Sequence, residues 1–102
     1  MKLIYISGPM SNLPELNFPA FHEAAAELRA AGCSVLNPAE HDEAPDKEWH
    51  EYLRKDIKLL MDCTHVVLLP GWENSKGARL EVHIARELGM SVSLINGDTL
   101  PA

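Results

Sequence analysis

The sequence predicts a small doubly wound α/β sandwich, in which helices cover both faces of a parallel sheet of four to five strands. Short apolar runs alternate along the chain with amphipathic helical segments, which is the pattern of parallel βαβ units. Residues 66–69 (VVLL) are continuously apolar, as in strands of a sheet that is covered on both sides. The chain has 102 residues, the size of one domain, and we expect a single domain over residues 1–102.

The first half of the chain is predicted to contain two strands and one helix. Residues 2–7 (KLIYIS) are rich in β-branched and aromatic side chains and end before Gly8 and Pro9, which break regular structure. A helix should begin at residue 18 and end at Gly32. Its apolar positions at helical spacing are Phe18, Phe21, Ala25 and Leu28. Residues 33–37 (CSVLN) form the second strand, which Pro38 closes.

The second half of the chain is predicted to contain two helices and two strands. A loop over residues 39–47 leads to a helix for which Asp46 is the expected N-cap. The inner stripe of this helix should consist of Trp49, Leu53, Ile57 and Leu60. The remaining elements are a strand at 64–70 (THVVLLP), a loop at 71–75 (GWENS), a helix at 76–89 that ends at Gly89, and a strand at 90–95 (MSVSLI).

Composition and charge argue against two classes of partner. Fifteen acidic residues against nine basic ones give a net charge of −6, whereas polymeric nucleic acid is bound by clustered Lys and Arg. No apolar run approaches the roughly 18 residues of a membrane span, and the N-terminal run is too short for a signal peptide. Cys33 and Cys63 lack CxxC spacing and are expected to be free thiols. We therefore expect a cytoplasmic protein without a membrane or nucleic-acid partner.

The predicted fold indicates where a ligand would bind. In doubly wound sheets this is beyond the carboxyl ends of the strands, near the point where strand order reverses. Two loops follow predicted strands at that edge, residues 8–17 and 70–75. Asn74 or Ser75 should cap the next helix, whose free N–H groups favour an anion, although capping without a ligand is more common. The sequence contains neither GxxxxGK[ST] nor GxGxxG.

Glu81 is the most informative single residue. Its helical spacing places it on one face with Ala78, Ala85 and Leu88, where packing alone would favour an apolar side chain. A carboxylate in such a place is costly unless it is paired or used in chemistry. The alternative is that this face is only half buried and that Glu81 is solvated or salt-bridged.

Other residues carry weaker signals. Asp56 borders the apolar stripe of its helix, and Tyr5 lies inside the first strand, where a buried phenol usually finds a hydrogen-bond partner. The alternatives are that Asp56 forms a pair within its own helix, with Lys55 or a neighbour of Arg54, and that the Tyr5 ring only fills the core. Trp72 either stacks on a planar ligand or covers the end of the sheet. The five histidines show no HxxxH or HExxH spacing and form no Cys/His pattern typical of zinc, so no metal site is expected.

Three segments together resemble the nucleoside 2-deoxyribosyltransferase superfamily, including its 2'-deoxynucleoside 5'-monophosphate N-glycosidases. They are IYISGPM at 4–10, RKDIKLLMDCTHVVLL at 54–69 and SKGARLEVHIARELGMSV at 75–92. GPM and LLPGWENSKGARLE resemble most a compact branch found in phages and bacteria. The resemblance implies a flavodoxin-like, Rossmann-like sandwich. Glu81 matches the family's nucleophile, Tyr5 the tyrosine that orients it, and Asp56 the aspartate that contacts the base.

The resemblance also implies how a nucleoside or nucleotide is held. Ser75 matches the serine that holds the phosphate in the monophosphate-hydrolysing members. Arg79 stands where the family often has glycine, and it would either narrow the pocket or contact a phosphate. The residues expected to bind substrate are Ser7, Gly8, Pro9, Met10, Trp72, Asn74, Ser75, Gly77 and Arg79. The family and the apolar helix faces of so small a sheet both imply a homo-oligomer, a dimer.

The expected reaction is cleavage or transfer of an N-glycosidic bond. Glu81 would attack C1' of a 2-deoxyribosyl group while Asp56 protonates the departing base, and the glycosyl–Glu81 ester would pass to water or a second base with retention. Tyr5 is expected to keep Glu81 ionised. No metal or redox cofactor takes part. Two other classes remain open: a non-catalytic nucleotide-binding or sensing module on the same fold, and a structural protein whose acidic surface and helix faces serve assembly.

Overall fold

The sheet has four parallel strands. The structure, a computed structural model, describes residues 2–41, 48–98 and 100. Within these residues the strands are β1 (Leu3–Ser7), β2 (Ser34–Leu36), β3 (His65–Leu68) and β4 (Ser91–Leu94), in the order β2-β1-β3-β4. Every pairing is parallel. The predicted parallel sheet of four to five strands is therefore confirmed, with four strands in the described part of the chain.

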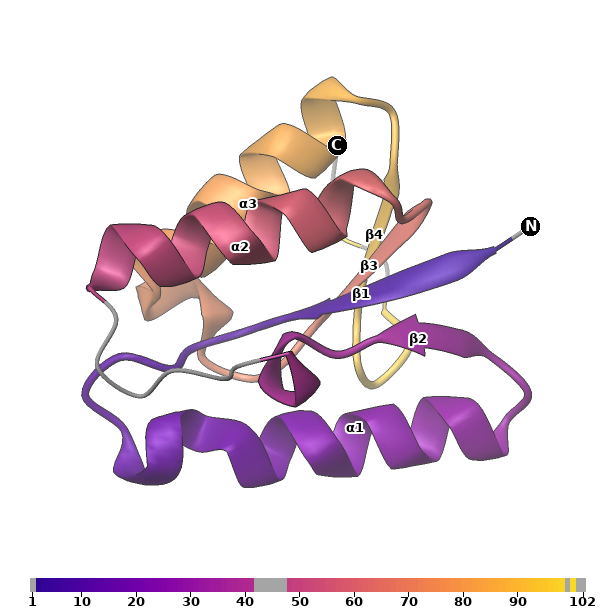
Figure 1. Ribbon diagram of the computed structural model, residues 1–102. Coiled ribbons are helices and arrows are strands. Elements are labelled where there is room, and N and C mark those ends of the chain that lie inside the picture. The colour runs from indigo at the N-terminus through magenta and orange to yellow at the C-terminus, as the bar shows by residue number, and fades with distance from the viewer. Residues whose placement is uncertain (1, 42–47, 99, 101–102) are drawn as a thin grey trace.

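Helices cover both faces of the sheet, as predicted. The helix α1 (Phe18–Ala30) lies on one face, and α2 (Trp49–Met61) and α3 (Lys76–Glu87) lie on the other (Figure 1). Each face has its own apolar core, because alternate residues of a strand point in opposite directions. Ile4 and Ile6 of β1 belong to the α1 side, whereas Tyr5 belongs to the side of α2 and α3.

The helix ends follow local signals in the sequence. Gly32 follows α1 and Gly89 follows α3, with φ angles of +92° and +74° that an L side chain rarely adopts, which confirms both glycine stops. The helix α2 begins at Trp49 and has Glu48 in the N-cap position. Asp46, the expected N-cap, lies outside the described residues.

Two residues of the predicted inner stripes lie on the surface instead. Trp49 is 41% exposed, although Leu60 of the same stripe is fully buried. Trp49 occupies the first turn of α2, where it lines a cavity rather than the core. Leu88 is 59% exposed. The helix α3 ends at Glu87, so Leu88 no longer follows the helical periodicity from which its burial was predicted.

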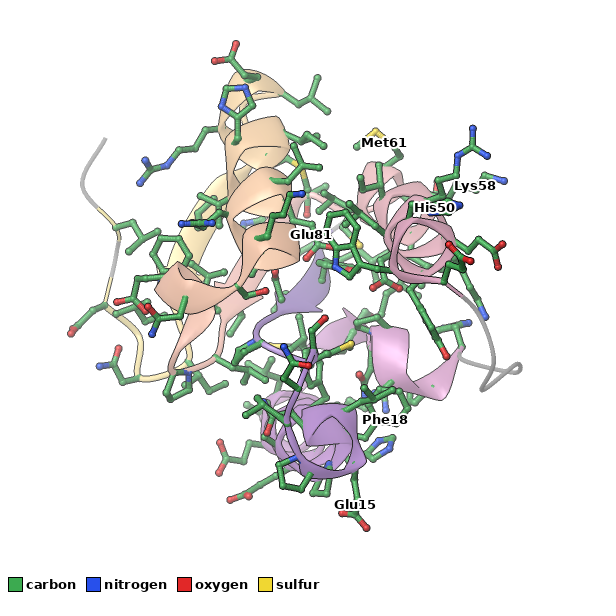
Figure 2. All side chains as sticks on the ribbon, turned by 90° about the vertical axis from the view of Figure 1, so that its left-hand side faces the viewer. Glu15, Phe18, His50, Lys58, Met61 and Glu81 are labelled. Atoms are coloured by element: carbon green, nitrogen blue, oxygen red, sulfur yellow. The ribbon has the colours of Figure 1, made fainter. Side chains whose placement is uncertain are left out.

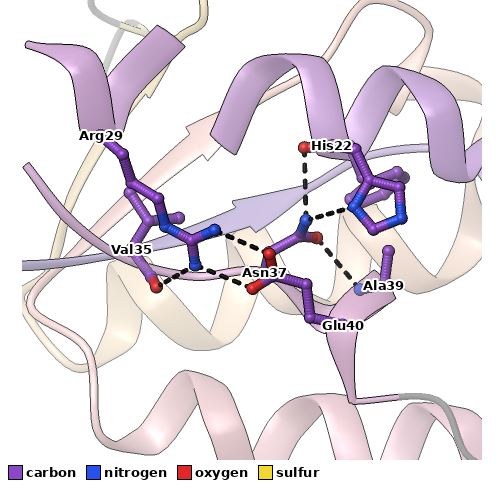
Figure 3. A network of polar contacts seen from close by, with 7 residues as sticks. His22, Arg29, Val35, Asn37, Ala39 and Glu40 are labelled. Carbon is purple, nitrogen blue, oxygen red and sulfur yellow. Dashed lines mark hydrogen bonds and ion pairs between the residues drawn. The ribbon is translucent and has the colours of Figure 1, made fainter. Parts of the chain in front are cut away.

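A polar network fixes the end of β2 against α1 (Figure 3). The buried Asn37 accepts a hydrogen bond at Oδ1 from the Ala39 amide (3.0 Å) and donates through Nδ2 to the Phe21 carbonyl (3.4 Å). Next to it, Arg29 donates two hydrogen bonds to the Glu40 carboxylate, at 2.7 and 2.8 Å. The segment after β2, expected to be a loop, thus begins with a short 3₁₀ turn, Pro38–Glu40.

Both cysteines are free thiols, as predicted. Burial raises the pKa of the Cys63 thiol to about 11, so this thiol stays protonated and unreactive at neutral pH. Among the described residues, no helix combines the length and the apolar character needed to cross a bilayer.

Candidate active site

A cavity of about 300 Å³ opens at the carboxyl end of β1. The chain leaves β1 for β2 on one side and later returns to β3 on the other, so this edge is the switch point where doubly wound folds bind ligands. The walls come from β1 and the loop after it, from α2, and from the first turns of α3. Of the two loops expected here, residues 8–17 line the cavity at several positions, whereas Ser75 is the only lining residue from 70–75.

Glu81 lies at the cavity wall, between α2 and α3 (Figure 2), and is only 5% exposed. The Tyr5 hydroxyl donates a hydrogen bond to its Oε2 (2.7 Å), and the Ser7 hydroxyl donates to its Oε1 (2.6 Å). The alternative expectation, a half-buried face with a solvated or salt-bridged Glu81, is therefore wrong. The carboxyl group is buried, and two neutral donors on β1 hold it.

The surroundings shift the pKa values of both Glu81 and Tyr5. Burial raises the pKa of Glu81 to about 7, and the hydrogen bonds from Ser7 and Tyr5 offset only part of this rise. Burial also raises the pKa of Tyr5 well above its usual value, and the nearby charges of Glu81 and Asp56 raise it further. The sequence predicts that the Tyr5 hydrogen bond keeps Glu81 ionised. The hydrogen bond acts in that direction, but loss of solvent outweighs it.

Asp56 is the second carboxylate of the cavity. It comes from α2, is half-buried, and lies close enough to Tyr5 for its charge to raise the pKa of the phenol. The fold therefore brings together Tyr5, Asp56 and Glu81, the three residues predicted to be catalytic. They come from β1, α2 and α3 respectively.

Ser75 both caps the N-terminus of α3 and lines the cavity. Its Oγ accepts a hydrogen bond from the Ala78 amide (3.1 Å), so Ser75 rather than Asn74 caps the helix. Ser75 also lines the cavity, as do three other residues expected to bind substrate, Gly8, Met10 and Gly77.

Five residues expected to bind substrate stand outside the cavity lining: Ser7, Pro9, Trp72, Asn74 and Arg79. Ser7 reaches the site only through Glu81. Trp72 packs against the apolar core on the side of α2 and α3, which agrees with the interpretation that it covers the end of the sheet. Asn74 and Arg79 are exposed. A role of these residues in ligand binding stays a prediction that the geometry does not favour.

Sequence reasoning missed the aromatic wall of the cavity. Trp49 and Tyr52 both line it from the first turn of α2, and their spacing of three residues, which places them on one face of a helix, was a usable signal. The Lys76 Nζ atom lies 4.8 Å from the centre of the Trp49 ring, in a cation–π contact that joins the starts of α2 and α3. Leu16, Phe21 and other lining residues from the α1 side carried no such signal.

Within the described residues, no group of three His, Cys, Asp or Glu side chains is arranged to hold a metal ion.

The fold is similar to the folds of two solved enzymes. One is a 2-deoxyribosyltransferase from the psychrotolerant bacterium Bacillus psychrosaccharolyticus, with a TM-score of 0.69 and 20% identity over 90% of this chain and 70% of that chain. The other is a 2-desoxiribosyltransferase from Leishmania mexicana, with a TM-score of 0.69 and 19% identity over 92% of this chain and 63% of that chain. The fold is thus nucleoside 2-deoxyribosyltransferase-like, and the predicted fold class is confirmed.

Sequence comparison places the chain in a family. No curated protein matches it significantly. One family model, described as "Domain of unknown function (DUF4406)", matches residues 2–94, which is most of the chain. The chain therefore belongs to the DUF4406 family.

Proposed function

We propose that this protein cleaves or transfers the N-glycosidic bond of a 2'-deoxynucleoside or its 5'-monophosphate, through a covalent intermediate on Glu81. One observation carries the proposal: a buried carboxyl group, held at both oxygens by the hydroxyls of Tyr5 and Ser7, borders a cavity that it shares with Asp56. A buried carboxylate without a cationic partner is costly to keep, and such groups concentrate at functional sites.

The two carboxylates have complementary roles in the proposed reaction. The ionised form of Glu81 is the nucleophile, and Asp56 helps to protonate the departing base. Glu81 attacks C1' of the deoxyribosyl group, the C1'–N bond breaks, and Asp56 gives its proton to the departing base. Water or a second base then displaces Glu81 from C1', and two inversions give overall retention.

The walls of the cavity suit a small ligand with one planar and one anionic end. Trp49 and Tyr52 offer aromatic surface for a base. Ser75 lines the cavity at the N-terminus of α3, where a 5'-phosphate would meet free amide groups. The volume of about 300 Å³ lies at the lower end of the range for small-molecule sites. The folds of the two 2-deoxyribosyltransferases support the same chemistry by analogy.

A non-catalytic nucleotide-binding or sensing module is the second candidate. One observation favours it: with a pKa of about 7, a large fraction of Glu81 is protonated at neutral pH and cannot attack. A protonated Glu81 would instead act as a hydrogen-bond donor to a bound ligand.

The test of both candidates is release of free base. The purified protein is incubated at pH 8 with each of the four deoxynucleoside 5'-monophosphates and each nucleoside, with and without an acceptor base, and free base is followed by chromatography. The variants are Glu81→Ala and, as a matched control on the exposed side of the same helix, Glu87→Ala. We expect release by the wild type and Glu87→Ala and none by Glu81→Ala. Unchanged release by Glu81→Ala would contradict the nucleophile, whereas a ligand-dependent rise in Tm without release would favour the binding module.

We also propose that the protein forms a homodimer through α2 and α3. Met61, Leu80 and Leu88 on this side are 46%, 38% and 59% exposed, and apolar surface of this kind marks association sites. Light scattering should give the mass of two chains, and Met61→Lys with Leu88→Lys should halve it. A monomeric wild type would overturn this assignment without affecting the proposed chemistry.

A further inference from the structure

Ser7 contacts Glu81 although it is not part of the cavity wall. Its side chain is 1% exposed, and its hydroxyl donates a hydrogen bond of 2.6 Å to Oε1 of Glu81. Ser7 and Tyr5 are two residues apart in β1, so their side chains lie on the same face of the sheet, the face that α2 and α3 cover. Glu81 is thus held from one strand by two successive donors, one for each oxygen.

The backbone of Ser7 is itself firmly placed. Its carbonyl accepts a hydrogen bond from the Leu69 amide (2.9 Å), and Ser7 pairs with Leu68 at the end of β3. A buried serine hydroxyl requires a partner, because an unmade hydrogen bond in the core costs free energy. An apolar side chain would satisfy the packing at this position without that requirement. The hydroxyl is therefore explained by its partner, the Glu81 carboxyl group.

The two oxygens of Glu81 are not equivalent. Tyr5, which donates to Oε2, lines the cavity. Ser7, which donates to Oε1, does not line it. The donor to Oε2 is therefore a residue of the cavity wall, whereas the donor to Oε1 lies behind that wall.

We infer that Ser7 is a positioning residue that anchors Oε1 of Glu81 and leaves Oε2 as the atom that attacks. This inference rests on the proposed function and adds to it a residue and an atom. In the first step Oε2 forms a bond to C1', the C1'–N bond breaks, its electron pair goes to the base, and the base takes the proton of Asp56. Oε1 becomes the carbonyl oxygen of the ester and keeps its hydrogen bond from Ser7. In the second step water or an acceptor base attacks C1', its proton returns to Asp56, and Oε2 leaves as carboxylate.

Ser7→Ala should change both the pKa of Glu81 and the orientation of its carboxyl group. A donor to the ionised form favours that form, so its loss should raise the pKa of Glu81 by about one pH unit. The acid limb of kcat/KM should move by the same amount, which is about a tenfold loss at pH 6 that vanishes by pH 9. In addition, kcat should fall by a factor that does not depend on pH, because Oε1 of Glu81 is no longer held in place by the Ser7 hydroxyl. Ser7→Thr, which keeps the hydroxyl, should restore the acid limb.

The experiment reads the Glu81 titration in two independent ways. Carboxyl ¹³C NMR of protein labelled at glutamate, assigned with Glu81→Gln, gives the midpoint directly, and the pH profile of base release gives it through activity. Ser34→Ala, an exposed strand serine, is the control and should change neither. If Ser7→Ala does not fold, Ser7→Cys, with its weaker donor, should show a smaller shift in the same direction.

The outcomes separate this inference from the proposed function. A shift of the NMR midpoint in Ser7→Ala that Ser7→Thr reverses supports the anchor, even if no variant releases base, in which case the proposed reaction fails. Base release whose acid limb and NMR midpoint are the same in wild type and Ser7→Ala overturns the role of Ser7 and leaves the reaction standing.

Discussion

The Tyr5 hydroxyl donates a 2.7 Å hydrogen bond to Oε2 of Glu81, although 76 positions separate the two residues. Tyr5 lies in β1, an inner strand, and Glu81 lies on α3, which follows the neighbouring strand β3. The helix α3 packs on β3 and β4, and since β1 pairs with β3, the Glu81 side chain can reach from α3 to Tyr5 and Ser7 on β1. The site therefore depends on one β–α connection that places an acidic residue where the fold excludes water.

Glu81→Gln should make the protein more stable at alkaline pH. The folded-state pKa of about 7 lies above the ordinary value of 4.5, so the folded state holds this proton more tightly than the unfolded state. The stability due to the protonated group is present below about pH 4.5 and is lost as the pH rises through 7, by about 3 kcal/mol. Denaturant unfolding at pH 5 and pH 8 should show a wild-type loss that Glu81→Gln lacks. An equal change in both proteins would contradict the raised pKa.

Asp56→Asn should slow departure of the base without displacing Glu81. Loss of a general acid typically lowers the rate by about 10²–10⁴-fold, and the loss should shrink for a deoxyriboside whose leaving group needs no proton. Asp62→Asn, an exposed change at the end of the same helix, is the matched control and should leave kcat unaffected. An equal loss with both leaving groups would show that Asp56 does not act as the acid.

Substitutions of Ser75 should separate its capping role from its role toward a phosphate. Ser75→Ala removes the acceptor of the Ala78 amide and should lower the free energy of unfolding by about 1 kcal/mol. Ser75→Asp keeps a good N-cap but adds a negative charge at the cavity. It should therefore retain stability and selectively raise the KM for 5'-monophosphates. If the KM values for nucleosides and monophosphates rise together, no phosphate binds at Ser75.

Gly8→Ala should be far more damaging than Gly77→Ala, although both glycines line the cavity. A Cβ at Gly8 would lie 2.8 Å from the Leu69 Cβ, which the chain cannot move without shifting its backbone, and we expect a loss of about 1–3 kcal/mol. A Cβ at Gly77 would make an ordinary contact, 3.6 Å from the Leu53 Cδ1. Thermal unfolding should show a clear drop in Tm for the first variant only, and similar values for both would contradict the close approach at Gly8.

The two tryptophans should respond in opposite ways to truncation. Trp49→Ala removes a cavity wall that is 41% exposed and should raise KM with little change in Tm. Trp72→Ala removes a ring that packs on the core and should lower the free energy of unfolding by about 1–2 kcal/mol with KM preserved. Measured KM and Tm values in the reverse pattern would restore Trp72 as the stacking residue predicted from the sequence.

Local signals in the sequence were sufficient for the elements of the fold. The glycine stops at Gly32 and Gly89 were correct because a positive φ is a property of the residue itself and of the turn it makes. Helical periodicity wrongly predicted that Trp49 and Leu88 are buried. Trp49 is the first residue of α2, and Leu88 directly follows α3. Periodicity describes the face of a helix on which a residue lies, but not whether the sheet extends far enough to cover that turn.

The sequence by itself determined the fold class, the succession of strands and helices, and the anomaly of a carboxylate at Glu81, because these follow from periods and turn residues close together in the chain. Only the tertiary structure decided which groups surround Glu81. Its two donors come from β1, the second carboxylate and the aromatic wall from α2, and its pKa from the loss of solvent that these elements impose together. Desolvation depends on every atom around a group. Because the atoms around Glu81 come from residues that are distant in sequence, local sequence patterns do not predict its desolvation.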